Sequence, residues 1–153
     1  MKLLLVFPSL LLTVLTSPTS ELIKITNKYY ISRDPQSFTQ AFDLCESRGM
    51  QMPSVTSFHQ ELDIYYDALI DQPLIYYWIA GFYKNTTEYQ GWTWLTTDEP
   101  FDWTDWRNGK EPSIWLNVDN CIKLGNPVPG NLGKGLWERD FCDNIAAALC
   151  EIP

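Results

Sequence analysis

Four cysteines are the residues of this chain best suited to chemistry: Cys45, Cys121, Cys142 and Cys150. Cysteines either bind zinc as thiolates or pair as disulfides. Zinc is disfavoured because the sequence has no Cys-x-x-Cys pair and His59 is its only histidine. In an oxidising compartment an even number of cysteines indicates disulfides, so we predict two, with a pairing that the residues alone do not decide.

Catalytic groups form no motif in this sequence. His59 follows Phe58 in the expected first turn of a helix, and no motif nucleophile lies nearby, so we expect a solvated surface side chain. Two carboxylates distant in the sequence could still meet to hydrolyse a glycoside, although no pattern indicates such a pair. We predict that the chain is not an enzyme.

The sequence contains an N-glycosylation sequon, Asn85-Thr86-Thr87, in a polar stretch between two expected strands. Sequons are used when they lie on exposed loops of secreted proteins. We therefore expect a glycan on Asn85 and an exposed loop around it.

The N-terminal segment has the pattern of a secretory signal peptide. Lys2 precedes an apolar run over residues 3–15, which ends in small polar residues suited to cleavage. The run is shorter than the ~20 residues of a membrane helix, and the alternative, an uncleaved anchor, lacks a basic flank or a second hydrophobic stretch. We predict a cleaved signal peptide over 1–20, one secreted, extracellular domain over 21–153, and no membrane span.

The charge of the chain argues against one group of partners. Its formal net charge is −8 at pH 7, and lysine and arginine form no cluster in the sequence. Proteins that bind phosphate backbones or anionic lipids need such a cluster. We predict that neither nucleic acid nor a membrane surface is a partner.

Two helices are expected near the start of the mature chain. One should begin at Ser37 and end at Gly49, and another should run from Ser57, with Gln60 completing a capping box, to before Pro73. The apolar side of the second helix comprises Phe58, Leu62, Tyr65, Tyr66 and Leu69. Short β-prone runs lie at 28–31, 75–79, 91–95, 115–116, 121–124, 136–138 and 146–152. Helices first and strands afterwards predict an α+β fold.

A long loop is expected over 96–115, and long ordered loops usually carry function. Its tryptophans, Trp103, Trp106 and Trp115, should be half-buried and should pin the loop to the body of the domain rather than stack on a ligand. A second loop is expected over 125–135, either as a tolerated insertion or as a rim of the binding face.

Several ordered motifs resemble the C-type lectin domain family across almost the whole mature chain. They are Trp78-Ile79-Ala80-Gly81, Gly91-Trp92-Thr93-Trp94, Trp103-Thr104-Asp105-Trp106, Glu111-Pro112-Ser113, and Trp137 five residues before Cys142. The resemblance implies the C-type lectin-like fold, with two helices, small antiparallel sheets and a long ligand loop. It also implies the disulfides Cys45–Cys150 and Cys121–Cys142.

In this family a calcium ion that ligates sugar hydroxyls is held by an acid-proline tripeptide, an acid before the third cysteine and an Asn-Asp pair after the last tryptophan. Calcium takes oxygen ligands, which suits such a set. The resemblance implies a cis bond before Pro112. By position, it assigns the ligand roles to Glu111, Ser113, Asp119, Glu138 and Arg139.

Arg139 departs from the family pattern, because it offers donors only and would place a positive charge beside a divalent cation. Either its guanidinium pairs with Glu111 or Asp119 and leaves the surface metal-free, or it turns outward and Asp140 supplies the missing carboxylate. We expect the first, since a shift of one residue in a strand turns a side chain to the opposite face. Calcium is therefore the disfavoured cofactor, with the candidate ligands Glu111, Ser113, Asp119 and Glu138.

The resemblance implies a secreted carbohydrate-binding protein that recognises glycans on microbial or cell surfaces, a role in innate immunity. The sugar is left open, since Glu111-Pro112-Ser113 matches neither the mannose-type Glu-Pro-Asn nor the galactose-type Gln-Pro-Asp signature. The alternative is a calcium-independent module of the same fold that binds a protein or another non-sugar ligand.

Overall fold

The computed structural model describes residues 20–73, 76–125 and 136–153. Almost all of the expected signal peptide and of the loop over 125–135 lies outside these residues. Two helices precede most of the strands, which confirms the α+β fold. The elements are β1 (Leu22–Lys24), β2 (Tyr29–Ser32), α1 (Phe38–Ser47), α2 (Phe58–Ile64), a π-helical turn η1 (Tyr65–Leu69), β3 (Tyr77–Asn85), β4 (Gln90–Trp94), β5 (Asn120–Leu124), β6 (Trp137–Phe141) and β7 (Ala147–Glu151). The expected strand at 115–116 is wrong, because these residues belong to the long loop.

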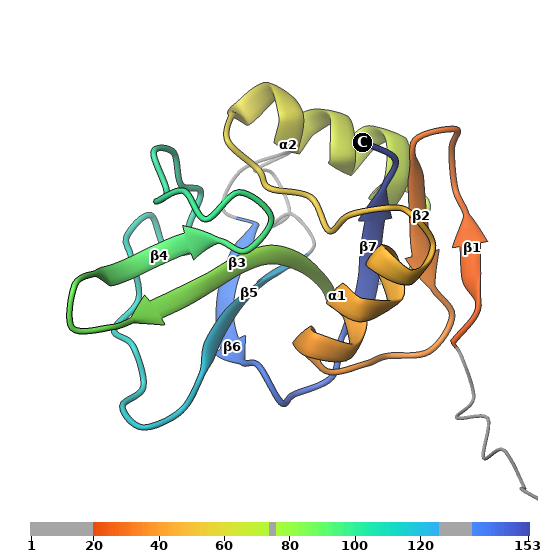
Figure 1. Cartoon of the computed structure of the whole chain (residues 1–153). Helices are drawn as coiled ribbons and strands as arrows, with labels where there is room; N and C mark the ends of the chain where they lie inside the picture. Colours follow the sequence, from red (N-terminus) through yellow and green to blue (C-terminus); the bar gives the residue numbers. More distant parts are fainter. Residues whose placement is uncertain (1–19, 74–75, 126–135) are drawn as a thin grey trace, which may run out of the picture.

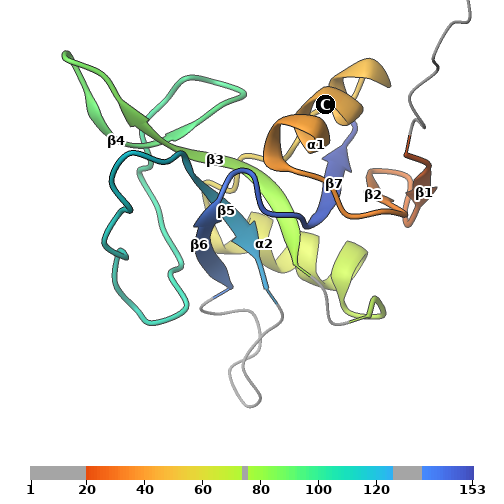
Figure 2. The same ribbon diagram turned by 90° about the horizontal axis from the view of Figure 1, so that it is seen from below.

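The strands pair in the order β1-β2-β7-β3-β5-β6, and β4 lies off this path and pairs with the second half of β3, from Gly81 to Asn85 (Figures 1 and 2). The described pairs are antiparallel, as expected, except that β3 and β7 run parallel, with Tyr77 opposite Ala147. Strand β7 therefore joins the N-terminal strands to the strands that carry the long loops.

Helix α1 forms where the sequence predicts it. The Ser37 hydroxyl accepts from the Gln40 amide and the Gln40 side chain accepts from the Ser37 amide, so a capping box starts the helix. Gly49, with φ 69°, ends it. The buried side of α1 carries Cys45, whose disulfide to Cys150 ties the helix to β7 and confirms the first expected pairing.

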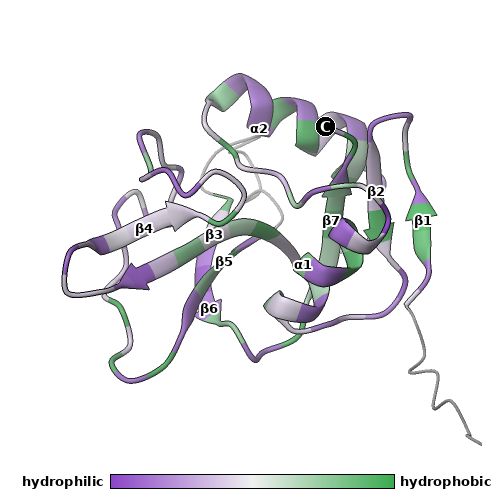
Figure 3. Ribbon diagram, in the orientation of Figure 1, coloured by the Kyte–Doolittle hydropathy of each residue, from purple (hydrophilic) through white to green (hydrophobic). Residues whose placement is uncertain are grey.

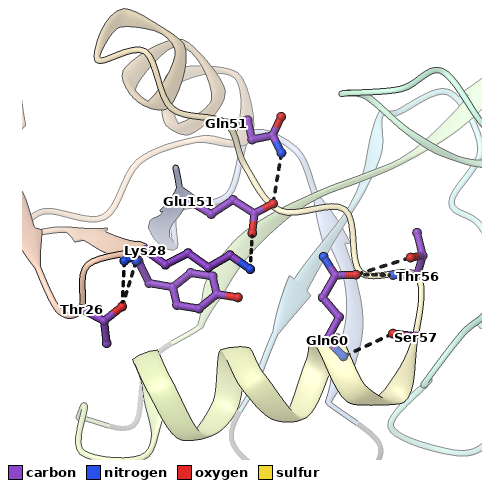
Figure 4. Close-up of polar contacts among 8 residues, drawn as sticks. Thr26, Lys28, Gln51, Thr56, Ser57, Gln60 and Glu151 are labelled. Atoms are coloured by element: carbon purple, nitrogen blue, oxygen red, sulfur yellow. Dashed lines mark hydrogen bonds and ion pairs between the residues drawn. The ribbon is translucent and has the colours of Figure 1, made fainter. Parts of the chain in front are cut away.

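Helix α2 differs from its prediction in two details. The Ser57 hydroxyl accepts from the Gln60 amide, but the Gln60 side chain accepts from the amide of Thr56, one residue before the cap (Figure 4). Phe58 and Tyr66, expected on the buried side, are 36% and 48% exposed. The buried residues are instead Glu61, Ile64, Tyr65, Ala68 and Leu69. The helix continues into the wider η1 turn, whose i→i+5 bonding changes the angular spacing at Tyr66, whereas Phe58 lies ahead of this turn, in the first residue of α2.

The C-terminal end of β7 is held by a buried carboxylate. Glu151 is 5% exposed, accepts from the Gln51 amide side chain at 3.1 Å, and pairs with Lys28 Nζ at 3.6 Å (Figure 4). A buried charge needs such partners. Three segments distant in the sequence therefore meet where the described chain ends.

Trp137 of β6 is the hub of the aromatic core. Its ring centroid lies 5.3–5.6 Å from those of Trp94, Phe101, Trp103 and Trp106, each in a near-perpendicular contact. Trp103 and Trp106 thus pin the long loop to the body of the domain, as predicted. Hydrophobic residues predominate along β7 and in the interior part of β3, whereas the tip of the β3–β4 hairpin is hydrophilic (Figure 3).

The same indole holds a buried acid. Trp137 Nε1 donates to Glu61 Oε1 at 2.6 Å, and Glu61 is fully buried. Burial raises the pKa of Glu61 to about 9, and the neighbouring Asp105 carboxyl adds to the shift through hydrogen bonding and charge repulsion. Glu61 is therefore protonated at neutral pH and links α2 to the long loop and to β6.

We predict that Glu61→Gln stabilises the protein at alkaline pH. Native Glu61 keeps its proton up to about pH 9, whereas the unfolded chain loses it near 4.5. The stabilisation that protonated Glu61 provides is complete below pH 4.5 and is lost as the pH rises towards about 9. Between these values the free energy of unfolding falls with pH, with a limiting slope of about 1.4 kcal/mol per pH unit. Glutamine keeps the bond from Trp137 and does not titrate. Denaturant unfolding at pH 5 and pH 8 should therefore show that the free energy of unfolding of the variant depends less on pH than that of the parent, and that the variant is the more stable of the two at pH 8.

The matched control is Asp63→Asn, which removes an exposed carboxylate from the same helix. It should leave the pH dependence of unfolding as in the parent protein. An equal pH slope in the parent and in Glu61→Gln would show that Glu61 is not protonated in the fold.

Candidate functional site

Strand β6 carries three of the expected ligand residues and turns them to opposite faces of the sheet. Lys123 of β5 lies opposite Glu138 and is a diagonal neighbour of Asp140. Alternation along the strand places Arg139 on the other face, which it shares with Trp137. Glu138 and Asp140 therefore lie on one face of the sheet, and Arg139 lies on the other.

The carboxylate of Asp140 is bound within its own chain. Lys123 Nζ lies 2.6 Å from Asp140 Oδ2, and both side chains are about 15% exposed. Asn144 Nδ2 donates to Asp140 Oδ1 at 2.7 Å. Burial by itself would raise the pKa of Asp140, but the bonds from Lys123 and Asn144 outweigh it and hold that pKa below its ordinary value. The alternative in which Asp140 supplies a calcium ligand is therefore not the arrangement seen.

The carboxylate of Glu138 is also bound within the chain. It forms an ion pair with Arg107 Nε, and Tyr76 donates to it at 3.4 Å. The ammonium of Lys123 lies over the ring of Tyr76, 3.9 Å from the ring centroid, in a cation–π contact. Two cations of the chain thus neutralise the two carboxylates on this face.

Arg139 lies on an aromatic ring, not on a carboxylate. Its guanidinium carbon is 3.2 Å from the centroid of Trp115, and its Nη1 donates to the backbone carbonyl of Ser113. Trp115 packs in turn on Phe141, with centroids 4.0 Å apart. Burial of the guanidinium lowers the pKa of Arg139, and the charge of Asp140 opposes this shift.

The expected ion pair of Arg139 with Glu111 or Asp119 is wrong. Both carboxylates lie on exposed positions of the long loop, and among the described residues neither forms an ion pair with Arg139. The ring of Trp115 occupies the face of the guanidinium instead, and a planar cation on an aromatic face combines dispersion with electrostatic attraction. The cis bond before Pro112 is also wrong, since the described peptide bonds are all trans.

The residues present do not fit a calcium ion. Of the expected set, the structure joins Ser113 to Arg139, pairs Glu138 with Arg107 and Asp140 with Lys123, and leaves Glu111 and Asp119 exposed. In the described part of the chain, no group of three or more acidic, histidine or cysteine side chains could hold a metal. Calcium requires six to eight converging oxygens, and a guanidinium at the centre of the set repels it.

A groove of about 830 Å³ lies beside the Arg139–Trp115–Phe141 stack. Three segments form it: the end of β3 with the following turn (82–86), the long loop over 114–120, and the turn at 141–144. The second expected disulfide, Cys121–Cys142, is present and joins two of these walls. Leu116 and Val118, which are 77% and 47% exposed, give the groove an apolar side.

Asn120 shapes the wall that the long loop provides. Its buried side chain accepts from the Trp115 amide at 3.0 Å and donates to the carbonyls of Trp115 and Val118 at 3.0 and 2.8 Å. Asn117, with φ 62°, makes the tight bend between them. Sequence reasoning missed Asn120 and Phe141, although an asparagine in the loop before Cys121 is a residue that commonly bonds to nearby backbone.

Comparison with known proteins gives the family to which this fold belongs. Residues 34–152 match the family model described as the lectin C-type domain. The chain therefore belongs to the C-type lectin domain family.

Solved structures show the same fold at low sequence identity. The carbohydrate-recognition domain of the mouse scavenger receptor C-type lectin is 24% identical, over 85% of this chain and 93% of that one, with a TM-score of 0.62. The cow CD23 domain, solved in the presence of a GlcNAc2Man3 oligosaccharide, is 20% identical over 85% and 91%, with a TM-score of 0.59. The Ca2+-independent C-type lectin SPL-2 of Saxidomus purpuratus is 20% identical over 81% and 86%, with a TM-score of 0.58.

We predict that Arg139→Lys loosens the wall of the groove. Lysine lacks the planar guanidinium that lies on Trp115, so stability should fall by about 0.5–1 kcal/mol. Amide hydrogen exchange over residues 114–120 should become faster, as mass spectrometry of peptides can measure.

The matched control is Arg48→Lys, at the exposed C-cap of α1. It should change neither stability nor exchange in the loop. Unchanged exchange over 114–120 in Arg139→Lys would contradict a structural role for the stack.

Proposed function

We propose that the chain is a secreted protein that binds carbohydrate in the groove and does so without calcium. The observation that carries this proposal is the groove itself, which sets aromatic and apolar side chains beside amides and carboxylates in a lectin-family domain. Asp119 lines the groove, and Arg139, which is bonded to Ser113, stacks on the lining residue Trp115. Glu111 is exposed on the same long loop, whereas Glu138 and Asp140 form ion pairs on the other face of the sheet.

The chemistry of the groove suits a neutral sugar. A sugar ring has apolar C–H faces, which pack on aromatic rings, and hydroxyls, which bond to amides and carboxylates. Phe141, 37% exposed, offers such a ring, and Asn117, Asp119 and Asn144 offer polar groups. The carboxylates of Asp119 and Asp143 in the lining disfavour anionic sugars.

Calcium independence is supported by the ion pairs of two of the candidate acids. Glu138 and Asp140 already have cationic partners, and Arg139 occupies the position at which the family pattern has an aspartate. The similar fold of SPL-2, which is described as Ca2+-independent, supports the view that the domain can work without the ion.

Secretion is supported by the N-terminal signal pattern and by the two disulfides, which persist in oxidising compartments. None of the helices in the described residues is both long and apolar enough to cross a membrane. We propose one domain over 21–153 after cleavage of 1–20, extracellular recognition of glycans on microbial or cell surfaces, no enzymatic activity, and no nucleic-acid partner.

A second candidate function is binding of a protein or another non-sugar ligand. Leu116, Val118 and Ile145, 47–77% exposed, favour it because apolar side chains at such exposure often mark an interaction surface. Retention on sugars separates the two candidates.

The calcium test compares the melting temperature in calcium chloride and in chelator. A lectin that used the ion would gain about 2.7 kcal/mol at a hundred times its Kd. We expect equal melting temperatures and equal retention on mannose or galactose resin in both buffers. A rise in melting temperature with calcium would refute calcium independence.

The groove test is Phe141→Ala. Loss of one ring face should weaken sugar binding roughly 3- to 10-fold, equivalent to about 0.7–1.4 kcal/mol. Leu95→Ala is the control, since Leu95 has the same 37% exposure and lies outside the groove lining. Equal affinities for sugar in the two variants would place the site elsewhere, and no retention of the parent protein on any sugar would favour the second candidate.

A further inference from the structure

The expected glycosylation residue is part of the groove wall. Asn85 ends β3, is exposed, and lines the groove together with Thr86. It pairs with Gln90 at the tip of the β3–β4 hairpin, where the ribbon is hydrophilic (Figure 3). A sugar attached to its side chain begins at the edge of the groove.

We propose that the glycan on Asn85 occupies the groove of its own chain and competes there with external sugar. This inference rests on the proposed function, since it gives the same site a regulator that the chain carries itself. The occupant is an N-linked glycan attached through the amide nitrogen of Asn85.

The sequon is accessible to the modifying enzyme. Asn85, Thr86 and Thr87 are exposed in the turn between β3 and β4. The hydroxyl of Thr86 is used within the turn, where it bonds to the amide and carbonyl of Tyr89 at 3.0 Å. The side chain of Thr87, which completes the acceptor motif, has no such role in the turn.

The walls of the groove formed by the long loop and by the turn at 141–144 can be covered by a carbohydrate. Leu116 and Val118 expose apolar surface across from the sequon, and Phe141 adds the face of a ring. Glycan C–H faces can cover this surface, while Asn117 and Asn144 can bond to hydroxyls. The side chain of Asn120 and the Cys121–Cys142 disulfide hold the wall that the long loop provides.

Attachment makes the competition effective even if each contact is weak. A tethered sugar is present at an effective concentration in the millimolar range, which is comparable with the weak affinity of a single sugar site. If the groove is free for about a tenth of the time, the apparent Kd for an external sugar is about tenfold higher.

The experiment uses full-length protein secreted from eukaryotic cells, as the parent and as Thr87→Ala and Thr87→Ser. Thr87→Ala removes the acceptor motif and leaves Asn85 in place, whereas Thr87→Ser keeps the motif and is the matched control. Glycopeptide mass spectrometry measures occupancy of Asn85. Hydrogen exchange over 114–120, with α1 as the distant reference, measures cover of the groove, and binding to immobilised mannose and galactose measures affinity.

We expect Asn85 to be occupied in the parent and in Thr87→Ser. Thr87→Ala should show faster exchange over 114–120, unchanged exchange in α1, and sugar affinity about 3- to 10-fold tighter. An unmodified Asn85, equal exchange over 114–120 with and without the glycan, or equal sugar affinity of the two forms would each overturn the inference.

The proposed function can fail separately. If exchange over 114–120 depends on the glycan but neither form is retained on sugar, the glycan covers the groove and the groove is not a site for those external sugars. That result overturns competition and sugar binding, and leaves the glycan as a cover of an apolar surface.

Discussion

The structure depends on the position of the Trp137 indole. One face of β6 points this ring into a cage of Trp94, Phe101, Trp103 and Trp106, and its nitrogen donates to the protonated carboxyl of Glu61. These contacts fix the register of the strand against α2 and the long loop. A one-residue slip would turn a charged side chain into the aromatic core, so the strand has a single register.

That register decides what the next three residues can do. With Trp137 inside, Arg139 must share its face and meet the long loop, while Glu138 and Asp140 must turn to the opposite face and meet Arg107 and Lys123. The acids are thus neutralised within the chain, and the cation serves to stack Trp115 beside the groove. The neutralised acids on one face of β6 and the aromatic wall on the other are two results of one alternation.

Local signals in the sequence predicted much of the fold. Ser37 and Gly49 marked the ends of α1, because the chemistry of a helix end is contained in a few neighbouring residues, whereas the pairing of the cysteines was implied by the resemblance to the family. The sequence did not reveal contacts between distant segments. The burial of Glu61 depends on Asp105 and Trp137, which lie far along the chain, and the wider turn after α2 displaced its expected apolar side. The expectation that Arg139 pairs with a carboxylate was based on charge alone, and it missed the contact of the guanidinium with the ring of Trp115.

Two-dimensional NMR of the tryptophan indole groups tests the central claim most directly, with mannose or galactose added in the presence of a chelator. Trp115 borders the groove, whereas Trp137 is 1% exposed in the core. We predict that the Trp115 signal shifts progressively with sugar, while that of Trp137 stays in place, and that calcium changes neither result. A Trp115 signal that ignores both sugars, or that responds only when calcium is added, would contradict calcium-independent sugar binding in the groove.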